Sequence, residues 1–317
     1  MSNVSRARAA ASNSSERVTL SDKIIYNFKL LIVRLATDNG GAKNAFRRIE
    51  EMKRLARRYE EKTGRLAANS TITEIGFGAR PERAFAMTAF FGKVTAIDLD
   101  SPMLSLRDVV AIFRKNGLER ALKSAVRHAF FDARGWKAFH KAFRQEVPAY
   151  DPSSVAFIVG NAGDRSTWKA APRSDLIFSQ DVFEHVGTDD LRALLREIKN
   201  NLKEDGLLIT VPCVYTGITG GHDVDWYSHL VESNNKPEDA WRHLTDKNFR
   251  VNTYLNRLSR REYCNIFREA GFRIFRDEAR DGEIGRKFLT AEKRKDLADY
   301  DEYELFSNNV EFWLEPI

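Results

Sequence analysis

The sequence predicts an α/β fold in which a mostly parallel sheet is covered by helices on both faces. The stretch at 71–100 reads as a strand, a glycine-containing turn, a helix and a second strand that ends in acidic residues. Further apolar runs of strand length follow at 153–160, 174–180 and 206–213. An amphipathic helix pattern at 188–206, with an Asp cap and a Gly stop, separates the last two runs. Strands that alternate with helices favour a parallel sheet.

The remaining elements extend this pattern toward both ends of the chain. Apolar residues at helical spacing predict helices at 22–37 and 42–63, ahead of the first strand. A further helix is expected at 259–272, followed by a strand at 273–279, and a last strand is expected at 308–316. We therefore expect the two early helices to cover one face of the domain.

Composition divides the chain into a tail, a helical cap and one large domain. The tail is rich in Ser, Ala and Arg and has no apolar block, which predicts disorder and no secretory leader; an organelle transit peptide is the alternative. We place the three parts at 1–18, 19–65 and 66–317, with insertions into the last at about 101–150 and 213–258.

Composition also limits the class of protein. A chain of 317 residues with 43% hydrophobic content can build a packed core, and it contains no run of 18 apolar residues that could cross a membrane. Its two cysteines, Cys213 and Cys264, are too few for a disulfide framework or a structural zinc site. These features predict a cytoplasmic protein.

The formal charge of +6 is concentrated in two segments. Residues 1–65 hold 15 Lys and Arg against 7 Asp and Glu, and residues 101–150 hold 10 against 4. Within the second segment, 118–145 mixes cations with aromatic and aliphatic residues. Three interpretations stay open: a helix pair packed on the domain, an interfacial contact that makes the protein membrane-peripheral, and a nucleic-acid surface. No RNA-binding motif is present, so nucleic acid ranks last.

The sequence Glu-Ile-Gly-Phe-Gly at 74–78 places two glycines directly after the first strand. A tight turn without a ligand is one interpretation. A dinucleotide fingerprint is another, but it needs a third glycine at the position of Pro81, which has no amide hydrogen to offer a pyrophosphate. The third interpretation is a turn that lets a nucleoside cofactor lie against bare backbone.

Four motifs in order make the chain resemble the class I S-adenosylmethionine-dependent methyltransferases. The glycine turn is similar to their acid-x-Gly-x-Gly motif, and Asp98, twenty residues past Gly78, matches their ribose-binding carboxylate. The segments at 157–164, 174–186 and 194–212 are similar to the adenine-recognition segment, the Glu-His-Val motif, and the helix and strand that follow. The resemblance implies a doubly wound, seven-stranded Rossmann-like sheet with N-terminal helices and helical insertions.

The resemblance also implies contacts with the cofactor. The residues expected to bind S-adenosylmethionine are Glu74, Gly76, Phe77, Gly78, Asp98, Leu99, Asn161, Ala162, Gln180 and Asp181. Two positions depart from the family pattern: Arg80 stands where many members have glycine, and Asn161 where many have Asp. We expect Arg80 to point outward from the turn and the amide oxygen of Asn161 to accept from the adenine amine.

Methyl transfer to a hydroxyl oxygen needs a base that removes the proton. His185 follows the fourth strand, and His222 lies in a Gly-rich segment after the fifth, at the carboxyl ends where ligands bind in open α/β sheets. We therefore predict His185, His222 and Asp223 as catalytic residues. The alternatives are a packing role for His185 and an ordinary loop position for His222.

Asp181, Glu184 and His185 form the pattern Asp-x-x-Glu-His within one turn. It is similar to the Glu-x-x-Glu-His cluster of magnesium-dependent methyltransferases, and His222 or Asp223 could complete a mixed oxygen and nitrogen site. Glu-His-Val also occurs in the family without metal. We therefore predict no resident metal and keep Mg²⁺ at Asp181, Glu184 and His185 as the alternative.

The insertion at 213–258 is rich in Trp, Tyr, His and Asp, a mixture that suits a polar ring such as a sugar. Trp226 is expected to line the acceptor pocket, although these aromatics could instead form the core of a cap subdomain. The predicted function is S-adenosylmethionine-dependent O-methylation of a small or saccharide-like acceptor. The alternatives are a nucleic-acid methyltransferase, an NAD-dependent oxidoreductase and a non-catalytic scaffold that retains the fold.

Overall fold

The structure is a computed structural model that describes residues 40–78, 80–102, 133–251 and 253–317. The predicted tail at 1–18, the helix at 22–37 and most of the basic segment at 118–145 lie outside the described residues. Within the described ranges, no helix is both long enough and apolar enough to span a membrane.

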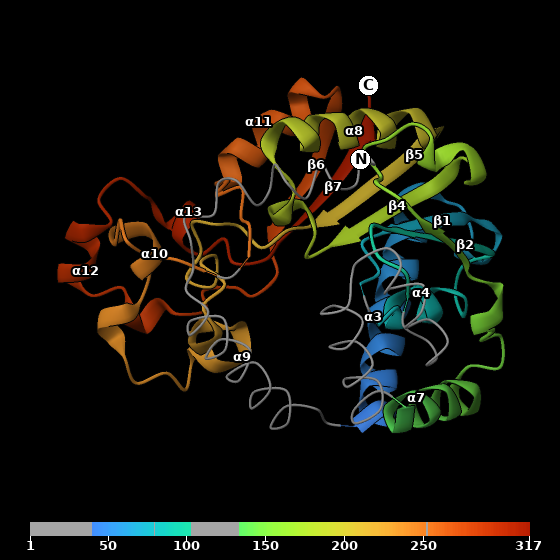
Figure 1. The fold of residues 1–317 in the computed structure, drawn as a ribbon, viewed down its shortest axis with the longest axis horizontal. Helices are drawn as coiled ribbons and strands as arrows, with labels where there is room; N and C mark the ends of the chain where they lie inside the picture. Colours follow the sequence, from blue (N-terminus) through green and yellow to red (C-terminus); the bar gives the residue numbers. More distant parts are fainter. Residues whose placement is uncertain (1–39, 79, 103–132, 252) are drawn as a thin grey trace, which may run out of the picture. The chain divides into compact units, whose positions relative to one another are not determined.

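The strands form a seven-stranded sheet (Figure 1) with the order β3-β2-β1-β4-β5-β7-β6. They are β1 (Thr71–Ile75), β2 (Lys93–Asp98), β3 (Ala156–Val159), β4 (Ser174–Gln180), β5 (Leu202–Val211), β6 (Phe272–Ala279) and β7 (Val310–Pro316). Strand β2 pairs in parallel with β1 and β3, whereas β7 runs antiparallel to β5 and β6. The predicted mostly parallel Rossmann-like sheet is confirmed.

The chain divides into two compact units, which are described separately. Among the described residues, the first unit comprises those up to 178 together with 200–206, and the second comprises 179–199 and 207–317. The first unit contains the helices α3 (Gly40–Thr63), α4 (Glu82–Met87) and α7 (Ala133–Glu146), with short 3₁₀ turns η1 (Ala67–Asn69), η3 (Pro152–Ser154) and η4 (Thr167–Ala170).

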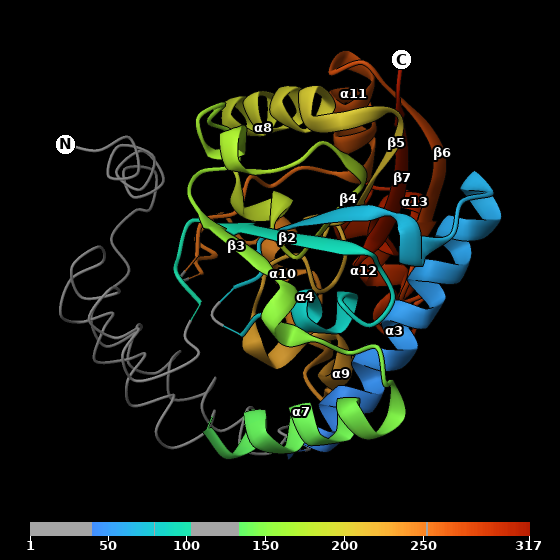
Figure 2. The ribbon, with the colours of Figure 1, turned by 90° about the vertical axis from the view of Figure 1, so that its right-hand side faces the viewer.

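Helix α3 confirms the second of the two predicted N-terminal helices. Ile49, Met52 and Tyr59 recur at helical spacing and are buried. Helix α3 packs against α4 and α7, and Figure 2 shows α3 and α7 side by side. A Cβ on Gly41 would lie 1.9 Å from the carbonyl oxygen of Gly135, so glycine is required where α3 and α7 approach most closely.

The second unit contains two longer helices, α8 (Thr188–Asn201) and α11 (Arg260–Glu269), which lie side by side (Figures 1 and 2). The short pieces are η5 (Phe183–His185), η6 (Val224–Trp226), α9 (Ser228–Val231), η7 (Pro237–Asp239), α10 (Arg242–Thr245), η8 (Arg286–Phe288), α12 (Ala291–Asp296) and α13 (Glu302–Leu305). Helix α11 begins with a capping box between Ser259 and Glu262 and ends before Gly271, whose φ is +79°. The helix expected at 259–272 is confirmed, and it ends at a glycine.

The predicted Gly stop of α8 is wrong. The helix ends at Asn201, and β5 begins at Leu202, ahead of Gly206. Gly206 is a strand residue, and a Cβ there would lie 2.9 Å from the carbonyl oxygen of Ser174. Glycine at this position therefore permits close strand packing, which a sequence pattern cannot distinguish from a helix stop.

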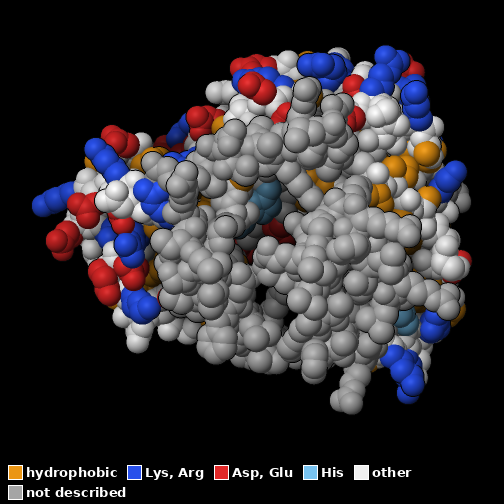
Figure 3. Space-filling model, viewed as in Figure 1, with side chains coloured by type: hydrophobic (Ala, Val, Ile, Leu, Met, Phe, Trp, Pro, Cys, Tyr) orange, Lys and Arg blue, Asp and Glu red, His pale blue; other side chains and the backbone are white. Residues whose placement is uncertain are grey.

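The outer surface of the region around α12 carries charges of both signs (Figure 3). Glu302 forms ion pairs with Arg286 at 2.8 Å and with Arg294 at 2.5 Å. The ammonium of Lys287 lies 3.5 Å from the carboxylate of Glu232. This part of the surface is therefore a mixed-charge face without a field of one sign.

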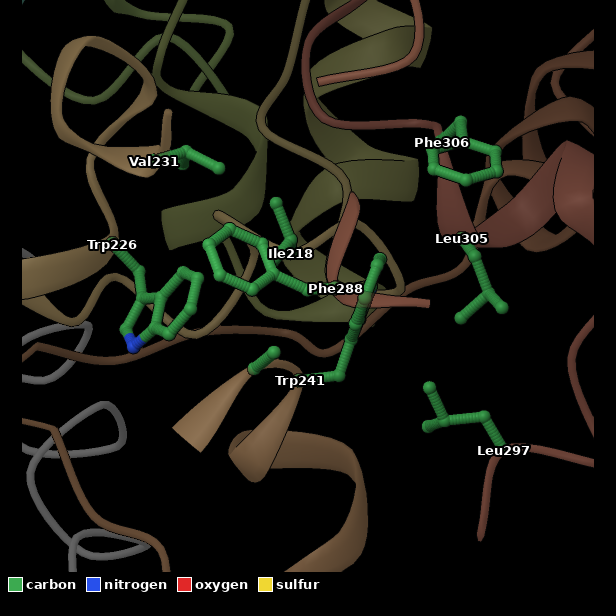
Figure 4. Close-up of a cluster of buried hydrophobic side chains, with 9 residues drawn as sticks. Ile218, Trp226, Val231, Trp241, Phe288, Leu297, Leu305 and Phe306 are labelled. Carbon is green, nitrogen blue, oxygen red and sulfur yellow. The ribbon is translucent and has the colours of Figure 1, made fainter. Parts of the chain in front are cut away.

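A cluster of buried hydrophobic side chains, here called the second core, is shown in Figure 4. It joins the insertion after β5 to residues 280–309, a segment between β6 and β7 whose contribution sequence reasoning missed. Its members are Ile218, Trp226, Val231, Ala240, Trp241, Phe288, Leu297, Leu305 and Phe306. Trp226 is only 3% exposed and packs edge-on against Phe288, with ring centroids 5.1 Å apart. Trp226 therefore belongs to a subdomain core, the alternative interpretation, and not to the surface of an acceptor pocket.

Candidate active site

The turn after β1 needs glycine at both predicted positions. Gly76 and Gly78 have φ values of +83° and +65°, a left-handed backbone that residues with side chains rarely adopt. The amide of Gly76 donates to the carbonyl of Ile97 at 2.8 Å. The amide of Gly78 donates to Oδ2 of Asp98 at 2.7 Å. Among the described residues, a Cβ on Gly78 would meet nothing within 4 Å.

Two of the predicted cofactor residues, Glu74 and Phe77, pack their side chains into the interior. Glu74 accepts a hydrogen bond from Nη1 of Arg83 at 3.2 Å; burial raises the pKa of this carboxyl, and the guanidinium opposes that effect. Phe77 packs edge-on against Phe157, with ring centroids 5.1 Å apart. Both side chains therefore anchor the turn from the side of the core.

A carboxylate and two apolar side chains lie at the ends of β2 and β3. Oδ1 of Asp98 accepts from the amide of Asp100 at 2.9 Å, so hydrogen bonds hold both carboxylate oxygens. Asp98 is paired with Val159 of β3, and Leu99 follows it. Leu99 and Val159 are each 38% exposed, which is high for large apolar side chains in this chain. Sequence reasoning missed Val159, because only the pairing of β3 with β2 places it beside Asp98.

The loop after β3 is built on Asn161 and Ala162. Oδ1 of Asn161 accepts from the amide of Gly163 at 2.9 Å, and the carbonyl of Asn161 accepts from Oγ1 of Thr167 at 2.7 Å. The indole of Trp168 donates to the carbonyl of Ala162 at 2.7 Å. These bonds fix the loop backbone, and Asn161 keeps one lone pair on Oδ1 and its Nδ2 protons for further contacts.

Arg80 points away from the turn, as predicted. Its Nη2 lies 3.4 Å from Oε1 of Glu82, and its guanidinium carbon lies 5.7 Å from the ring centroid of Trp136. The guanidinium is therefore held by side chains of α4 and α7, and the departure from glycine at this position leaves the turn itself unchanged.

In the second unit, Gln180 and Asp181 are fixed at the carboxyl end of β4. Asp181 has a φ of +58°, which is uncommon for a residue with a side chain, and its amide donates to the carbonyl of Val211 at 3.1 Å. Nε2 of Gln180 donates to Oδ2 of Asp181 at 3.2 Å. Oε1 of Gln180 accepts from Nη1 of Arg280 at 3.1 Å.

Glu184 is a buried carboxyl with little polar compensation. The residue is 3% exposed, and neither side-chain oxygen has a hydrogen bond of normal geometry within the described part of the chain. Burial and the nearby charge of Asp181 raise the pKa of Glu184 to about 8; the amides of Glu184 and Cys213 lie close enough to oppose the shift without making good hydrogen bonds. Such a group is costly to keep inside a protein.

Two histidines lie beside this carboxyl. The ring centroids of His185 and His222 are 5.1 Å apart, and the ring planes are nearly perpendicular at 82°. His222 has a φ of +51°, and its buried Nε2 has no hydrogen-bond partner among the described residues. Burial, together with His185 and His243, lowers the pKa of His222 to about 4, so its imidazole is neutral at neutral pH.

Glycine at position 221 lets the His222 loop pack on His243. A Cβ on Gly221 would lie 2.7 Å from Cγ of His243, so a side chain cannot be accommodated there without a shift. Nε2 of His243 is 2.8 Å from the carbonyl of Tyr215, and burial lowers the pKa of this imidazole to about 4. His243 is therefore a neutral, internally bonded residue that supports the loop.

A loop after the insertion positions η5 and was missed by sequence reasoning. The side-chain Nδ2 of Asn256 donates to the carbonyls of Phe183 and Val186 at 2.8 and 3.0 Å. The backbone amide of Asn256 donates to the carbonyl of Glu184 at 2.9 Å. Nδ1 of His185 lies 3.0 Å from the carbonyl of Tyr254 and donates to it, so Nε2 carries the free lone pair. No motif marks Asn256 or Tyr254, because their role depends on a contact across about seventy residues of chain.

Within the described ranges, the structure brings together part of the predicted catalytic and metal sets. One ligand atom from each of Glu184, His185 and His222 lies within 4.8 Å of the other two. Asp181 is not a member of this group. Oδ1 of Asp223 accepts from the amide of Asp225 at 3.1 Å and caps η6. His222 therefore takes the place that the sequence pattern gave to Asp181.

A mostly parallel sheet with a glycine turn after β1 and a carboxylate at the end of β2 fits both dinucleotide-binding enzymes and class I methyltransferases, the class that takes its methyl group from S-adenosylmethionine. The profile of a methyltransferase-domain family matches residues 47–276. The chain belongs to this family.

Similar solved structures include the plantazolicin methyltransferase BpumL in complex with SAH, at 13% identity over 99% of this chain and 95% of that chain, with a TM-score of 0.46. Another is the magnesium protoporphyrin IX methyltransferase ChlM from Synechocystis PCC 6803 with bound SAH, at 11% identity over 96% and 90%, with a TM-score of 0.43. A search of curated proteins gave no match. Likeness at these identities concerns the fold alone.

Proposed function

We propose that this methyltransferase transfers the methyl group of S-adenosylmethionine to a hydroxyl oxygen of a small, saccharide-like acceptor. The observation that carries the proposal is the group formed by the buried Glu184 and the more exposed His185 and His222 beyond the end of β4, because a hydroxyl acceptor is the kind that needs its proton removed. The cofactor contacts are proposed for the first unit and the acceptor chemistry for the second.

The cofactor's ribose diol is assigned to Asp98, whose carboxylate is already oriented by the amides of Gly78 and Asp100. Leu99 and Val159 supply apolar surface for the adenine ring, and the loop at Asn161 supplies polar groups for its edge. The bare backbone of the turn accommodates the methionine part. Leu99 and Val159 are exposed apolar residues at paired strand ends, where an apolar ring of a ligand could cover them.

The transfer forms an oxygen–carbon bond as the carbon–sulfur bond of the sulfonium breaks, which leaves S-adenosylhomocysteine as a neutral thioether. The acceptor's proton goes to Nε2 of His185, which is unprotonated because Nδ1 donates to the Tyr254 carbonyl. His222 stays neutral at neutral pH and can orient the acceptor hydroxyl. Holding the acceptor oxygen in line with the methyl–sulfur bond of the sulfonium supplies most of the remaining rate enhancement.

The saccharide-like acceptor is supported by the polar residues of the insertion after β5. With Trp226 and Trp241 in the second core, the partly exposed residues of the insertion include Tyr215, His222 and Tyr254. Hydroxyl and imidazole groups beside aromatic faces suit a polar ring with several hydroxyls.

Two observations weigh against the alternative functions. Helix α4 follows Pro81, whose nitrogen carries no hydrogen, so a pyrophosphate at this helix would lack one amide donor. This disfavours an NAD-dependent oxidoreductase. The face around α12 carries charges of both signs and is therefore not the basic surface that nucleic-acid binding would use, whereas most of the basic segment at 118–145 lies outside the described residues.

Calorimetry on the full chain tests the proposal. We expect S-adenosylhomocysteine to bind and NADH to give no heat of binding. The product of a polyhydroxylated acceptor and methyl-labelled cofactor should carry the label on oxygen, as read by NMR. Binding of NADH in place of S-adenosylhomocysteine, or a label found only on nitrogen or carbon, would overturn the proposal.

A further inference from the structure

We propose that Glu184, His185 and His222 form a binding site for a divalent first-row transition ion such as Mn²⁺ or Zn²⁺. One carboxylate oxygen and two imidazole nitrogens converge there, with all three ligand atoms within 4.8 Å of one another. Bonds of about 2.0–2.2 Å from each atom to one ion would bring the ligand atoms roughly 3–4 Å apart. The group therefore lies within small side-chain rotations of a ligating geometry.

The donor set selects the class of ion. Mg²⁺ is a hard cation that prefers oxygen ligands and keeps several waters, whereas imidazole suits zinc, iron and other first-row transition ions. Two nitrogens and one oxygen therefore favour a transition ion over Mg²⁺. The sequence pattern had paired Asp181 with Glu184 and so suggested the harder, oxygen-rich site.

The second support is the orientation of His185. Its Nδ1 donates to the carbonyl of Tyr254 at 3.0 Å, which fixes the tautomer and leaves the lone pair on Nε2. Ligating histidines in proteins almost always donate their other ring nitrogen to a carbonyl or carboxylate. Asn256 adds three hydrogen bonds to the backbone of residues 183–186, so η5 is held firmly at this place.

The third support is the polar atoms that the fold leaves without partners. Both side-chain oxygens of Glu184 and Nε2 of His222 are buried and lack hydrogen bonds within the described residues. Unsatisfied buried polar atoms are uncommon in native proteins, and each calls for an explanation. A cation between them satisfies all three residues at once.

Three protein ligands leave at least one coordination position for water or a substrate oxygen. A hydroxyl bound there would lose its proton more easily, because a divalent ion stabilises the alkoxide. With Nε2 of His185 on the ion, the proton would pass to solvent water, and the base role given to His185 above belongs to the ion-free protein. This last step rests on the proposed function. Ion binding itself does not, and it can be measured without any acceptor.

The test uses the full chain, stripped of metal with a chelator. Mn²⁺ binding is followed by the electron paramagnetic resonance of the free ion, and Zn²⁺ binding by competition with a chromogenic chelator. We expect one ion per chain in the wild type and roughly 10–100-fold weaker binding in Glu184→Gln and His222→Ala. Matched controls are Glu232→Gln and His229→Ala, two exposed residues of the same unit that should bind the ion as the wild type does.

S-adenosylhomocysteine binding, measured on each variant, separates loss of the ion site from loss of folding. A Co²⁺ spectrum of the wild type gives an independent check, because nitrogen and oxygen ligands from the protein shift the visible bands of the aquo ion. Wild-type binding no tighter than in His222→Ala, tighter binding of Mg²⁺ than of Mn²⁺, or an unshifted Co²⁺ spectrum would each overturn the proposal. If the ion fails to bind while S-adenosylhomocysteine binds and methyl transfer proceeds, the proposed function stands and this inference falls.

Discussion

The amide of Gly78 and the carboxylate of Asp98 are joined by a hydrogen bond of 2.7 Å, although twenty residues separate them in the chain. The bond links the turn after β1 to the end of β2. It holds the negative charge of Asp98 next to the glycine backbone of the turn. A nucleoside can lie against that backbone and donate hydrogen bonds from its ribose diol to the carboxylate. Both cofactor-side predictions start from this pair.

Asp98→Asn should weaken S-adenosylhomocysteine binding roughly 10–100-fold, because the diol would lose charge-assisted hydrogen bonds and keep neutral ones. Calorimetry measures the change. Asp151→Asn is the matched control: it removes the same charge from an exposed carboxylate that caps η3 in the same unit. Unchanged affinity in Asp98→Asn, or an equal loss in both variants, would remove Asp98 from the cofactor site.

Gly78→Ala should abolish or strongly weaken cofactor binding, whereas Gly64→Ala should not. The two glycines have φ values of +65° and +69°, and a Cβ on either would meet nothing within 4 Å. The backbone strain is therefore similar, at about 1 kcal/mol of stability in each case. The two variants should melt alike and differ in S-adenosylhomocysteine affinity. Similar affinities would show that the turn carries no ligand.

Trp226→Ala should destabilise the protein by about 3–5 kcal/mol, the usual loss when a buried aromatic is truncated. The reason is its position in the second core, where it packs on Phe288. Denaturant unfolding measures the loss, and Tyr227→Ala, a partly exposed neighbour, should cost less than half as much. Normal stability with a raised KM for the acceptor would return Trp226 to the acceptor pocket.

Glu51 makes stability depend on pH in the acid range. Burial alone would raise the pKa of this carboxyl, but the guanidinium groups of Arg48 and Arg83 lower it from 4.5 to about 2. Because the folded pKa lies below the unfolded one, the stabilisation is complete above about pH 5 and is lost as the pH falls through 4.5 toward 2. It amounts to on the order of 3 kcal/mol at most.

Melting temperatures of the wild type and Glu51→Gln, measured from neutral pH down to about pH 2, check this prediction. The gap between the two should narrow as the pH falls, because the variant has no such carboxylate to protonate. Glu50→Gln, at an exposed neighbouring residue, should follow the wild-type curve. A constant gap across the range would show that Glu51 stabilises the fold through its shape and not its charge.

The sequence was sufficient for the sheet because its strands are marked by local patterns. The glycine turn, the acid at Asp98 and the apolar run at 174–180 each lie within one element, and the structure places them where the patterns indicate. The prediction that a helix ends at Gly206 was wrong, because a glycine in a strand and a glycine after a helix look the same in one sequence. Their difference lies in a close approach to Ser174, which is distant in the chain.

The candidate site was predicted only in part, for the same reason. His185 was found because it sits in a motif, but its tautomer depends on Tyr254, which carries no motif. Val159 becomes a surface for a ligand only through its pairing with Asp98. The exchange of Asp181 for His222 in the ligand group follows from a loop held by Gly221 against His243. Each of these facts is a contact between segments that local patterns cannot encode.

His222→Ala should lower kcat roughly 10²-fold, the usual cost when an acceptor is no longer held in position. Its affinity for S-adenosylhomocysteine should stay within about twofold of the wild type, because the proposed cofactor contacts belong to β1, β2, β3 and their loops. Single-turnover kinetics with saturating cofactor measure the first quantity, and calorimetry the second. His229→Ala, an exposed histidine of the same insertion, serves as the control and should leave both unchanged. If His222→Ala lost cofactor affinity while the bound complex turned over normally, His222 would belong to the cofactor site, and the acceptor would have to be placed elsewhere.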